Sequence, residues 1–318
     1  MAQVDVVVVS YNSRDELARC VEPLAGVEAV SVVVVDNASS DGSLEAVAGL
    51  PGVATIALEH NLGFAAGCNA GWRAGTGEAV LFLNPDARIE AGSVARLVRV
   101  LDEQAGVGIA APRILHEDRT LDYSQRSFPR LRSTYGQALF AHRLFPRASW
   151  TDEVIRDERS YEEANAPDWV SGACLLVRRR TLEAVGGLDE GFFMYCEDKD
   201  LCRRVRNAGW DVRYVPDVVA VHAGGASAPR ASLLPVLAAS RIRYARKHQG
   251  TTTALLERFG VGLGAATRLL VSRGGAAARA GHGRAVLVTA SRAPSRAARQ
   301  SLNDHLAERT SPAFDDSR

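Results

Sequence analysis

Two short stretches of this chain carry acidic side chains in settings that suit chemistry. Asn84-Pro85-Asp86 follows directly on an apolar run, and Glu197-Asp198 opens a stretch with helical periodicity. A carboxylate beside a rigid turn can hold Mg²⁺ or Mn²⁺, because these ions prefer hard oxygen ligands. Such an ion neutralises the charge that develops on a departing diphosphate. The sequence therefore predicts that Asp86 anchors a metal ion, the alternative being that the stretch is a simple type I turn.

The acid pair Glu197-Asp198 lies on the apolar face of its predicted helix. An acid that leans towards an apolar interior has a raised pKa and becomes a usable general base. The alternative is that Asp198 caps the helix, while Asp200 favours its positive end and pairs with Arg204. We interpret Glu197 and Asp198 as catalytic and Asp200 as structural.

Polar side chains also follow two earlier apolar runs. The first run delivers Ser10-Tyr11-Asn12 and the second delivers Asp36-Asn37. Ligands of open parallel sheets bind beyond the carboxyl ends of the strands, so these side chains are expected to meet Asp86 there. Singly they could be helix caps or turns, but together they predict a ligand with a ring and an anionic part. Neither a Gly-x-Gly-x-x-Gly fingerprint nor a P-loop follows the first run, which disfavours dinucleotide and P-loop modes of binding.

The elements that must position these residues alternate between strands and helices. The early runs are apolar throughout, which is typical of strands covered on both faces, and interleaved helices imply a parallel sheet. The sequence thus predicts a doubly wound α/β fold with a mostly parallel, Rossmann-like sheet. We expect strands at 4–10, 30–36, 53–58, 79–84, 169–179, 211–215 and 218–221, helices at 15–24, 64–74, 93–104, 198–208 and from 232 onward, loops and short helices over 117–168, and an Ala/Arg-rich tail over 274–318 that is partly disordered.

Composition limits the class of protein. The 318 residues include 38 basic and 37 acidic side chains, so the net charge of +1 does not call for a nucleic acid partner. The five cysteines form no Cys-x-x-Cys pair, which favours a reduced compartment over a disulfide framework or a zinc site. No basic leader precedes the first apolar run, and no run has the length of a membrane span. We expect a cytoplasmic protein.

These motifs resemble those of the family 2 inverting glycosyltransferases of GT-A fold, and within them the bacterial rhamnosyltransferase-like group. They occur in the order of that family over residues 4 to 227. The stretches that carry the resemblance are "VVVVSYNS" (6–13), "VVVDNASSDGS" (33–43), "HNLGFAAGCNAGW" (60–72), "LNPDA" (83–87), "WVSGACLLVRR" (169–179), "VGGLDEGFFMYCEDKDLCRR" (185–204) and "VHAGGAS" (221–227).

The resemblance implies a site for a nucleotide diphosphate sugar, linked to dTDP or UDP. Tyr11 and Asn12, with Ser10 before them, would cradle the base and ribose, and Asp36 would accept a hydrogen bond from a uracil or thymine ring. A segment that closes over the nucleoside is implied at Asn61, Gly63 and Asn69.

The resemblance also assigns the reacting groups. Asn84-Pro85-Asp86 stands where the family has its Asp-x-Asp motif, so one anionic ligand is replaced by an amide that can offer a carbonyl oxygen or bond the ribose. Asp198 would be the general base, with Glu197 in reserve. His222 would reach the metal ion or the diphosphate, the alternative being a structural histidine.

The predicted acceptor side is less closely defined. Trp169 and Gly172 are expected to face the cleft, where the indole stacks on a sugar or packs in the core. We expect a catalytic domain over 1–230, with a nucleotide-sugar half at 1–112 and an acceptor half at 113–230. The helices at 231–273 combine apolar and cationic residues, as peripheral helices on anionic lipid do, which suggests the inner membrane surface.

The predicted reaction is transfer of a sugar to a glycan or polyprenyl-linked acceptor in cell-wall or polysaccharide synthesis. Rhamnose from dTDP-rhamnose is the favoured donor, and a UDP-sugar is the alternative. A nucleotidyltransferase is disfavoured because "SYNSRDELARC" lacks the Gly-rich, basic loop that such enzymes use. A noncatalytic sugar-nucleotide-binding protein would explain Asn84 but not the retained acid pair.

Overall fold

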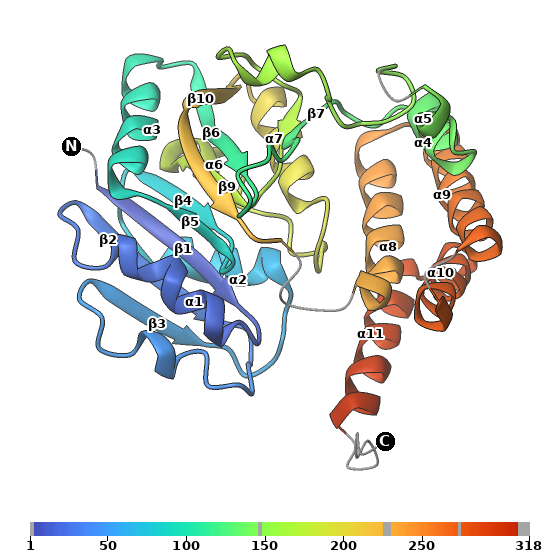
Figure 1. Cartoon of the computed structure of the whole chain (residues 1–318), viewed down its shortest axis with the longest axis horizontal. Coiled ribbons are helices and arrows are strands. Elements are labelled where there is room, and N and C mark those ends of the chain that lie inside the picture. Colours follow the sequence, from blue (N-terminus) through green and yellow to red (C-terminus); the bar gives the residue numbers. More distant parts are fainter. Residues whose placement is uncertain (1–2, 146–147, 225–229, 273–274, 311–318) are drawn as a thin grey trace. The chain divides into compact units, whose positions relative to one another are not determined.

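The computed structural model describes residues 3–145, 148–224, 230–272 and 275–310 (Figure 1). The chain forms two compact units. The N-terminal unit comprises Met1–Phe128, Glu153–Phe192 and Glu197–Ser227, and the C-terminal unit comprises Pro129–Asp152, Phe193–Cys196 and Ala228–Arg318. This division differs from the predicted boundary at residue 230, because residues 129–152 pack with the C-terminal helices.

An eight-stranded mixed sheet organises the N-terminal unit, in the order β3-β2-β1-β4-β9-β6-β10-β5 (Figure 1). The first four strands pair in parallel, as do β6 and β10, whereas β9 and β5 run antiparallel to their neighbours. The strands are β1 (Val4–Ser10), β2 (Val30–Asp36), β3 (Val53–Ala57), β4 (Ala79–Leu83), β5 (Ala87–Ile89), β6 (Val107–Leu115), β9 (Cys174–Arg178) and β10 (Asp211–His222). A separate short ribbon joins β7 (Gln125–Arg126) to β8 (Trp169–Val170).

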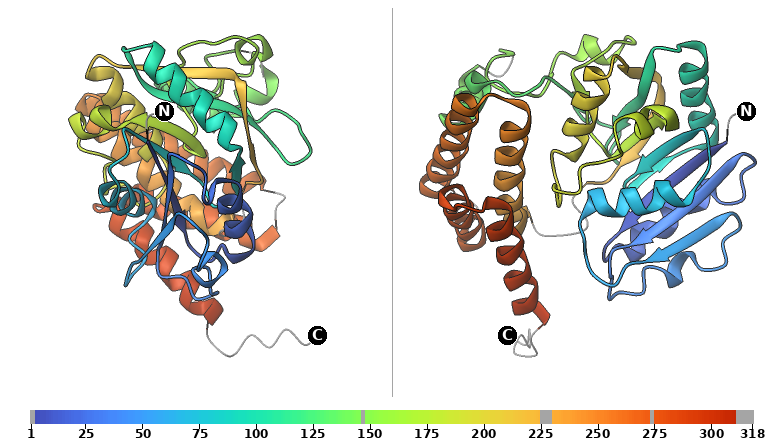
Figure 2. Two further views of the ribbon diagram at one scale, coloured as in Figure 1. Left: turned by 90° about the vertical axis from the view of Figure 1, so that its left-hand side faces the viewer. Right: turned by 180° about the vertical axis from the view of Figure 1, so that it is seen from behind.

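Helices cover both faces of this sheet, which is why β1 is buried along its whole length. Val6 and Val8 point into one core with α1 (Arg14–Val21) and α3 (Ala91–Glu103). Val7 and Val9 point into the other core with α2 (Phe64–Ala74), α6 (Arg179–Ala184) and α7 (Glu197–Asn207). Figure 2 shows these two layers from the side and from behind. The predicted doubly wound α/β arrangement is confirmed.

Two predicted strand boundaries change in the structure. The predicted strand 169–179 is broken into β8 and β9, and its last residue begins α6. The predicted strands 211–215 and 218–221 form one strand, β10, whose pairing with β6 shifts register between Val215 and Val219. A β-bulge of this kind bends a strand without ending it, and an apolar pattern cannot distinguish the two cases.

Glycines bring α2 unusually close to the sheet. A Cβ atom at Gly71 would lie 2.3 Å from Val7 Cγ1, and one at Gly67 would lie 2.7 Å from Val9 Cγ1. Both valines are buried and β-branched, so they have little freedom to move away. The helix therefore needs small residues on its sheet-facing side.

The C-terminal unit is helical. Its elements are α4 (Leu131–Ala138), α5 (Ala141–Leu144), α8 (Arg230–His248), α9 (Thr251–Val271), α10 (Gly275–Ala290) and α11 (Pro294–Thr310). Inside it, Glu257 accepts hydrogen bonds from Thr134 Oγ1 at 2.6 Å and from Arg241 at 2.9 Å. In the described part of the chain, no helix combines the length and the apolar character needed to cross a bilayer.

Most of the stretch 274–318, expected to be a partly disordered tail, is helical where the structure describes it. Helices α10 and α11 occupy residues 275–310, and Ala285, Val288, Ala298 and Leu302 join a core with α8 and α9. Alanine and arginine are among the best helix formers, so the composition that suggested disorder equally supports helices once an apolar face is buried. Residues 311–318 of the predicted tail lie outside the described residues.

Candidate functional site

The loops after β1 and β2 are fastened to each other. Asn12 Oδ1 accepts a hydrogen bond from Ser40 N at 2.9 Å, and Asn12 N donates to Ser39 Oγ at 2.9 Å. Asn12 has a φ of 51°, a left-handed conformation that asparagine tolerates better than most residues. The structure thus brings Ser10, Tyr11 and Asn12 to the same sheet edge as Asp36, as the strand order predicted.

Asp36 and Ser10 present buried oxygens that the described residues do not use. Asp36 is 6% exposed, and its Oδ2 accepts from Ser39 N at 2.9 Å. Its Oδ1 and the Oγ of Ser10 have no hydrogen-bond partner among the described residues. Buried polar atoms are normally satisfied, so two unused ones at adjacent strand ends indicate a place for a hydrogen-bonding ligand.

The segment after β3 joins this edge through Asn37. Asn37 Oδ1 accepts from Leu62 N, and its Nδ2 donates to Gly63 O, both at 3.0 Å. Gly63 has a φ of 92°, and its N–H donates a hydrogen bond to Asn61 Oδ1 at 3.0 Å. Asn61 and Gly63 are therefore close to the end of β2, which agrees with their predicted place beside a nucleoside.

Asn69 lies elsewhere. It is 1% exposed, on α2, and its Oδ1 accepts from Trp72 Nε1 at 2.9 Å and from Leu188 N at 3.0 Å. Its Nδ2 donates to Leu188 O and to Glu190 Oε1. These contacts occupy both ends of the amide, so Asn69 ties α2 to the segment before α7 and has no free group to offer a nucleotide.

Asp86 and His222 meet because β5 pairs antiparallel with the end of β10. His222 stands opposite Ala87, and Ala223 N donates to Asp86 O at 3.0 Å. His222 Nε2 lies 3.2 Å from Asp86 Oδ1 and 3.3 Å from the side-chain amide of Asn84. Its Nδ1 lies 3.9 Å from Asp122 Oδ2. The turn that carries Asn84 and Asp86 thus shares one cluster with His222.

The charge of His222 is set by its neighbours. Burial alone lowers the pKa of its imidazole, but hydrogen bonds and charges from Asp122 and Asp86 outweigh burial and raise the pKa to about 9. Among the described residues, no group of three or more histidine, cysteine or acidic side chains is arranged to hold a metal ion. Asp86, and His222 once it has lost its extra proton, nevertheless fit an ion that takes most of its ligands from substrate phosphates and water, as Mg²⁺ usually does.

The acid pair opens α7 as predicted, and the two carboxyl groups differ. Glu197 is 7% exposed, and its Oε2 has no hydrogen-bond partner among the described residues. Burial raises the pKa of Glu197 well above its ordinary value, and the charges of Asp198 and Asp200 add to the rise. Burial also raises the pKa of Asp198, but its hydrogen bonds with Lys199 N and Gly172 N oppose the rise. Asp200 pairs with Arg204 at 2.8 Å, as predicted.

The backbone just before this pair is strained. Tyr195 and Cys196 have φ values of 68° and 66°, which side chains with a Cβ atom rarely adopt. Each such residue costs about 1 to 3 kcal/mol, and strain of this size clusters at functional sites. The turn sets the direction from which Glu197 and Asp198 start the helix.

The backbone at Gly172 and Ala173 connects the turn that carries Asp86 with Asp198, the predicted general base. Gly172 N donates to Asp198 Oδ2 at 3.0 Å, and the next carbonyl, Ala173 O, accepts from Asn84 N at 2.9 Å. A Cβ atom at Gly172 would lie 3.1 Å from Asp198 Cβ, so a side chain here would have to displace Asp198 by a few tenths of an ångström. Gly172 therefore has a positioning role, and the donor turn and the base share one rigid support.

Trp169 lies in β8, three residues before Gly172. It is 8% exposed, donates from Nε1 to Ser127 O at 3.0 Å and packs in the sheet core. Lys199 Nζ lies 4.8 Å from its ring centroid and 2.6 Å from Glu153 Oε2. The indole thus packs as a core residue with a cation against it, and this is the alternative to stacking on a sugar.

Sequence reasoning missed several of these neighbours. Asp122 and Glu153 lie in the stretch 117–168, which has no periodic pattern, so no signal in the sequence distinguished them. Lys199 gave no signal either, because it stands two positions before Leu201 and so lies off the predicted apolar face.

A family model of glycosyl transferase family 2 matches residues 5–184. The chain is 35% identical over 231 residues to the N-acetylglucosaminyl-diphospho-decaprenol L-rhamnosyltransferase of Mycobacterium tuberculosis, an alignment that covers 68% of this chain and 75% of that one. It is 28% identical over 230 residues to rhamnosyltransferase WbbL of Escherichia coli (69% and 83% covered) and 24% identical over 230 residues to dTDP-rhamnosyl transferase RfbF of Shigella flexneri (70% of each).

Solved structures share the fold at lower identity. The mannosyltransferase PcManGT of Pyrobaculum calidifontis, in complex with GDP-Man and Mn²⁺, superposes with a TM-score of 0.53 at 19% identity, covering 99% of this chain and 88% of that one. GalNAc-T7 with UDP, GalNAc and Mn²⁺ gives 0.54 at 15% identity, covering 78% and 50%. Both of these structures contain Mn²⁺.

Proposed function

The chain belongs to glycosyl transferase family 2, and from this premise we propose that it transfers L-rhamnose from dTDP-rhamnose to a polyprenyl-diphosphate-linked glycan, with inversion at the anomeric carbon. The names of the relatives support the donor and the acceptor, since they include a dTDP-rhamnosyl transferase and a rhamnosyltransferase for a diphospho-decaprenol acceptor. The observation that carries the proposal is the shared support at Gly172 and Ala173, which joins the donor turn to Asp198.

The proposed donor site follows the strand ends. The unused Oδ1 of Asp36 accepts the ring N–H of the thymine, and the loop held by Asn12 lies against the base and ribose. The diphosphate lies at the cluster of Asn84, Asp86 and His222. Asp86 and His222 would hold a divalent cation there, which when bound neutralises the charge of the departing diphosphate.

Asp198 performs the proton transfer in this proposal. Its carboxylate takes the proton of the acceptor hydroxyl as that oxygen bonds to the anomeric carbon, and the bond from that carbon to the diphosphate oxygen breaks on the opposite side. The backbone N–H groups of Gly172 and Lys199 fix the carboxylate in place. Its raised pKa makes it a stronger base than an exposed aspartate.

The location proposed for this reaction is the inner face of the cytoplasmic membrane, where a polyprenyl-linked acceptor is accessible. The acceptor brings the enzyme to the bilayer, and the basic C-terminal unit supports a peripheral contact with anionic lipid.

The test is nucleotide release from a panel of dTDP-, UDP- and GDP-sugars, with Mg²⁺, Mn²⁺ or a chelator, in the presence of a polyprenyl-diphosphate acceptor. We expect release from dTDP-rhamnose only, dependent on acceptor and abolished by Asp198→Asn. The exposed Asp211→Asn variant is the matched control and should retain activity. Nucleotide binding without release from any donor would assign the protein to a noncatalytic sugar-nucleotide-binding role.

A further inference from the structure

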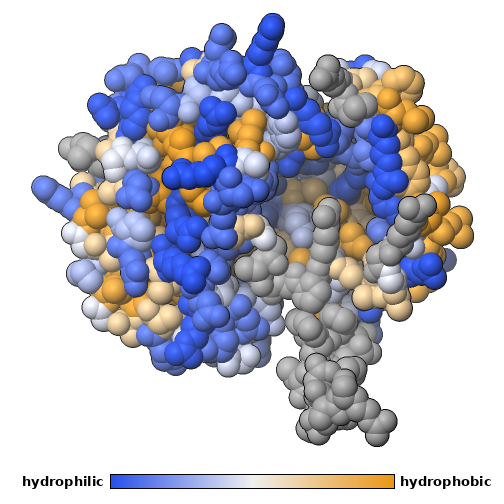
Figure 3. Space-filling model, viewed as in Figure 1, coloured by the Kyte–Doolittle hydropathy of each residue, from blue (hydrophilic) through white to orange (hydrophobic). Residues whose placement is uncertain are grey.

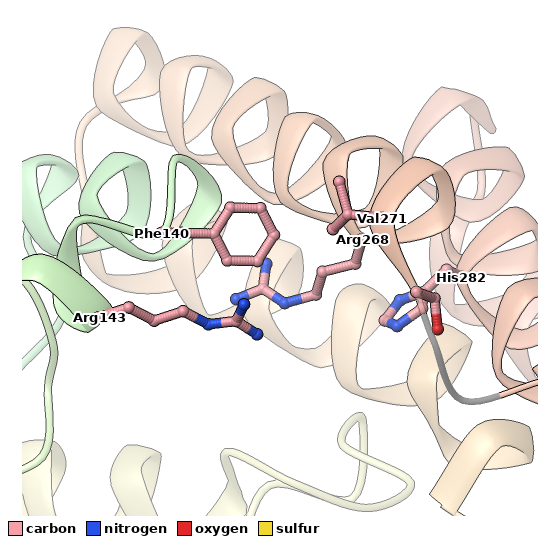
Figure 4. Close-up of a pocket in the computed structure, with 6 residues that line it drawn as sticks. Phe140, Arg143, Arg268, Val271 and His282 are labelled. Atoms are coloured by element: carbon pink, nitrogen blue, oxygen red, sulfur yellow. The ribbon is translucent and has the colours of Figure 1, made fainter.

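The C-terminal unit contains a pocket of about 490 Å³ that the proposed reaction does not use (Figure 4). Its lining comes from the end of α4, from α5, from the end of α9 and from α10. The lining residues are Phe140, Arg143, Arg268, Val271, Ser272 and His282. The volume lies within the range of small-molecule sites, so the pocket can take a ligand of a few heavy atoms or more.

Cationic groups gather in this pocket. The guanidinium groups of Arg143 and Arg268 lie 4.6 Å and 5.3 Å from the same ring centroid, that of Phe140 (Figure 4). Within the described chain, neither arginine forms an ion pair with an acid. Burial lowers the pKa of Arg268, the nearby charges of Arg241 and Arg143 lower it further, and the carboxylate of Asp152 offsets this only in part.

His282 adds an imidazole to the two guanidinium groups in the lining. Its pKa is lowered first by burial and then by the charge of Arg268. Groups of like charge held together repel each other, and an anion bound among them would remove that repulsion. The pocket is therefore complementary to a phosphate or a similar anion.

The rim of the pocket is apolar and exposed. Leu139 precedes Phe140 and is 62% exposed, and Leu144 follows Arg143 and is 77% exposed. Val271, which lines the pocket, is 55% exposed. Figure 3 shows hydrophobic residues gathered on the surface over α9. A soluble anion needs no such rim, whereas a lipid headgroup lies directly beneath apolar chains.

The charge of the surrounding helices agrees with this partner. Residues 231–302 contain 12 arginine and lysine side chains and one acid, Glu257, which is itself bound to Arg241. An anionic bilayer attracts such a segment, by about 1 kcal/mol for each basic side chain near its surface.

We propose that this pocket binds the phosphate of an anionic phospholipid, with Arg143 and Arg268 as the phosphate ligands and Leu139, Leu144 and Val271 inserted among the lipid chains. The proposal rests on the membrane location given under the proposed function, but not on the transfer reaction or its donor. It gives the C-terminal unit a ligand of its own.

The test measures sedimentation of the full chain with vesicles of phosphatidylcholine alone, and with about 30% phosphatidylglycerol added to supply an anionic surface. Arg143→Gln is the main variant, because Arg143 is exposed and its loss leaves the fold intact. Leu144→Ser tests insertion, and Arg296→Gln, which removes an exposed charge that does not line the pocket, is the matched control. No sugar nucleotide is present, so failure here is distinguishable from failure of the proposed reaction.

We expect binding to phosphatidylglycerol vesicles to weaken about fivefold in Arg143→Gln and about tenfold in Leu144→Ser, with the Arg296→Gln control unchanged. Equal binding by Arg143→Gln and the control would overturn the proposal. A further arm replaces phosphatidylglycerol with farnesyl diphosphate in neutral vesicles. Stronger, Arg143-dependent recruitment in that arm would assign the pocket to the acceptor's diphosphate and would also overturn the phospholipid assignment.

Discussion

Glu197 and Asp198 are neighbours in the chain but have different surroundings. Asp198 accepts two backbone hydrogen bonds, whereas Glu197 has a buried oxygen without a partner among the described residues. The first arrangement stabilises a carboxylate, and the second stabilises a neutral carboxylic acid. The two acids are therefore expected to have separate roles, an ionised base and a protonated neighbour.

This difference predicts opposite results for two conservative substitutions. Asp198→Asn removes the base and should lower kcat by about 10² to 10⁴. Burial raises the pKa of Glu197 and favours its neutral form, which Gln imitates, so kcat should change by less than about threefold in Glu197→Gln. Steady-state kinetics with both variants decide the matter. A large loss in Glu197→Gln with activity retained in Asp198→Asn would make Glu197 the base.

The same burial predicts the pH profile. The base must be deprotonated, and burial raises the pKa of Asp198, so activity should be present above that pKa and be lost as pH falls through it. The acidic limb of kcat/KM should therefore lie above about pH 4, where an ordinary aspartate titrates. The measurement is a kcat/KM profile with dTDP-rhamnose. A limb at or below the ordinary value would contradict the assignment.

Asn84 replaces a carboxylate at the predicted cation site, which gives a prediction about metal affinity. Asn84→Asp adds a negative ligand 3.3 Å from His222 Nε2, so the Mn²⁺ concentration for half-maximal activity should fall roughly tenfold. Asp86→Asn should raise it. The readout is a Mn²⁺ titration of nucleotide release, and an unchanged midpoint in both variants would place the ion elsewhere.

Much of this site could be predicted from single residues, for a physical reason. The carboxyl ends of β1, β2 and β4 share one sheet edge, so Ser10, Asp36 and Asp86 had to lie near one another once the strands were identified. Asp122 and Glu153 could not be found, because long-range contacts bring them in from an irregular segment. Asn69 was predicted to contact the nucleotide. The helical pattern around it does not show that the backbone of Leu188, far away in the sequence, hydrogen-bonds to its side chain.

Among the elements, α2 makes the tightest contact with the sheet. Gly71→Ala would place a methyl group 2.3 Å from Val7 Cγ1 and 3.1 Å from Val35 Cγ2. The helix would have to move outward, at a cost of about 1 to 3 kcal/mol in the free energy of unfolding. Gly92→Ala is the control, because a Cβ atom there meets nothing within 4 Å and alanine is the better helix former by up to about 1 kcal/mol. Urea unfolding of both variants measures the difference, and equal midpoints would show that α2 adjusts freely.

The parallel strands were predictable from their apolar runs, but the direction of β9 was not. Leu175 and Val177 face one core while Cys174 and Leu176 face the other, so the strand is apolar throughout in either orientation. Its antiparallel pairing with both β4 and β6 depends on the path of the chain through residues 116–168. The helices α10 and α11 could not be predicted from composition, because a stretch rich in alanine and arginine suits a helix and a disordered segment equally well.

The whole chain has almost no net charge, but the charge is divided. Residues 231–302 hold 12 of the 38 basic side chains and one of the 37 acids, which leaves 26 basic and 36 acidic side chains elsewhere. Residues outside this segment therefore carry a net negative charge. Anionic lipid should attract the C-terminal helices and repel much of the remaining surface, so the charge division orients the protein on a membrane.

This division predicts a strong effect of salt. Raising NaCl from about 0.05 M to about 0.5 M shortens the screening length severalfold, and binding to phosphatidylglycerol vesicles should weaken at least tenfold. Binding to neutral vesicles depends on the exposed leucines and should not weaken. Sedimentation across a salt series tests both expectations, and a salt-independent affinity for anionic vesicles would rule out electrostatic attraction as its source.

The place of β9 between β4 and β6 has a consequence for how the chain is made. Residues 81 and 176 are paired in the finished sheet, with nearly a third of the sequence between them. A nascent chain that has just completed β6 on the ribosome cannot join it to β4, so both strands keep an unpaired edge until β9 has been translated. Open edges of apolar strands recruit other chains, so the nascent chain is most exposed to aggregation during this interval. Slowing translation before residue 174 should lengthen that exposure, whereas slowing it after residue 178 should not.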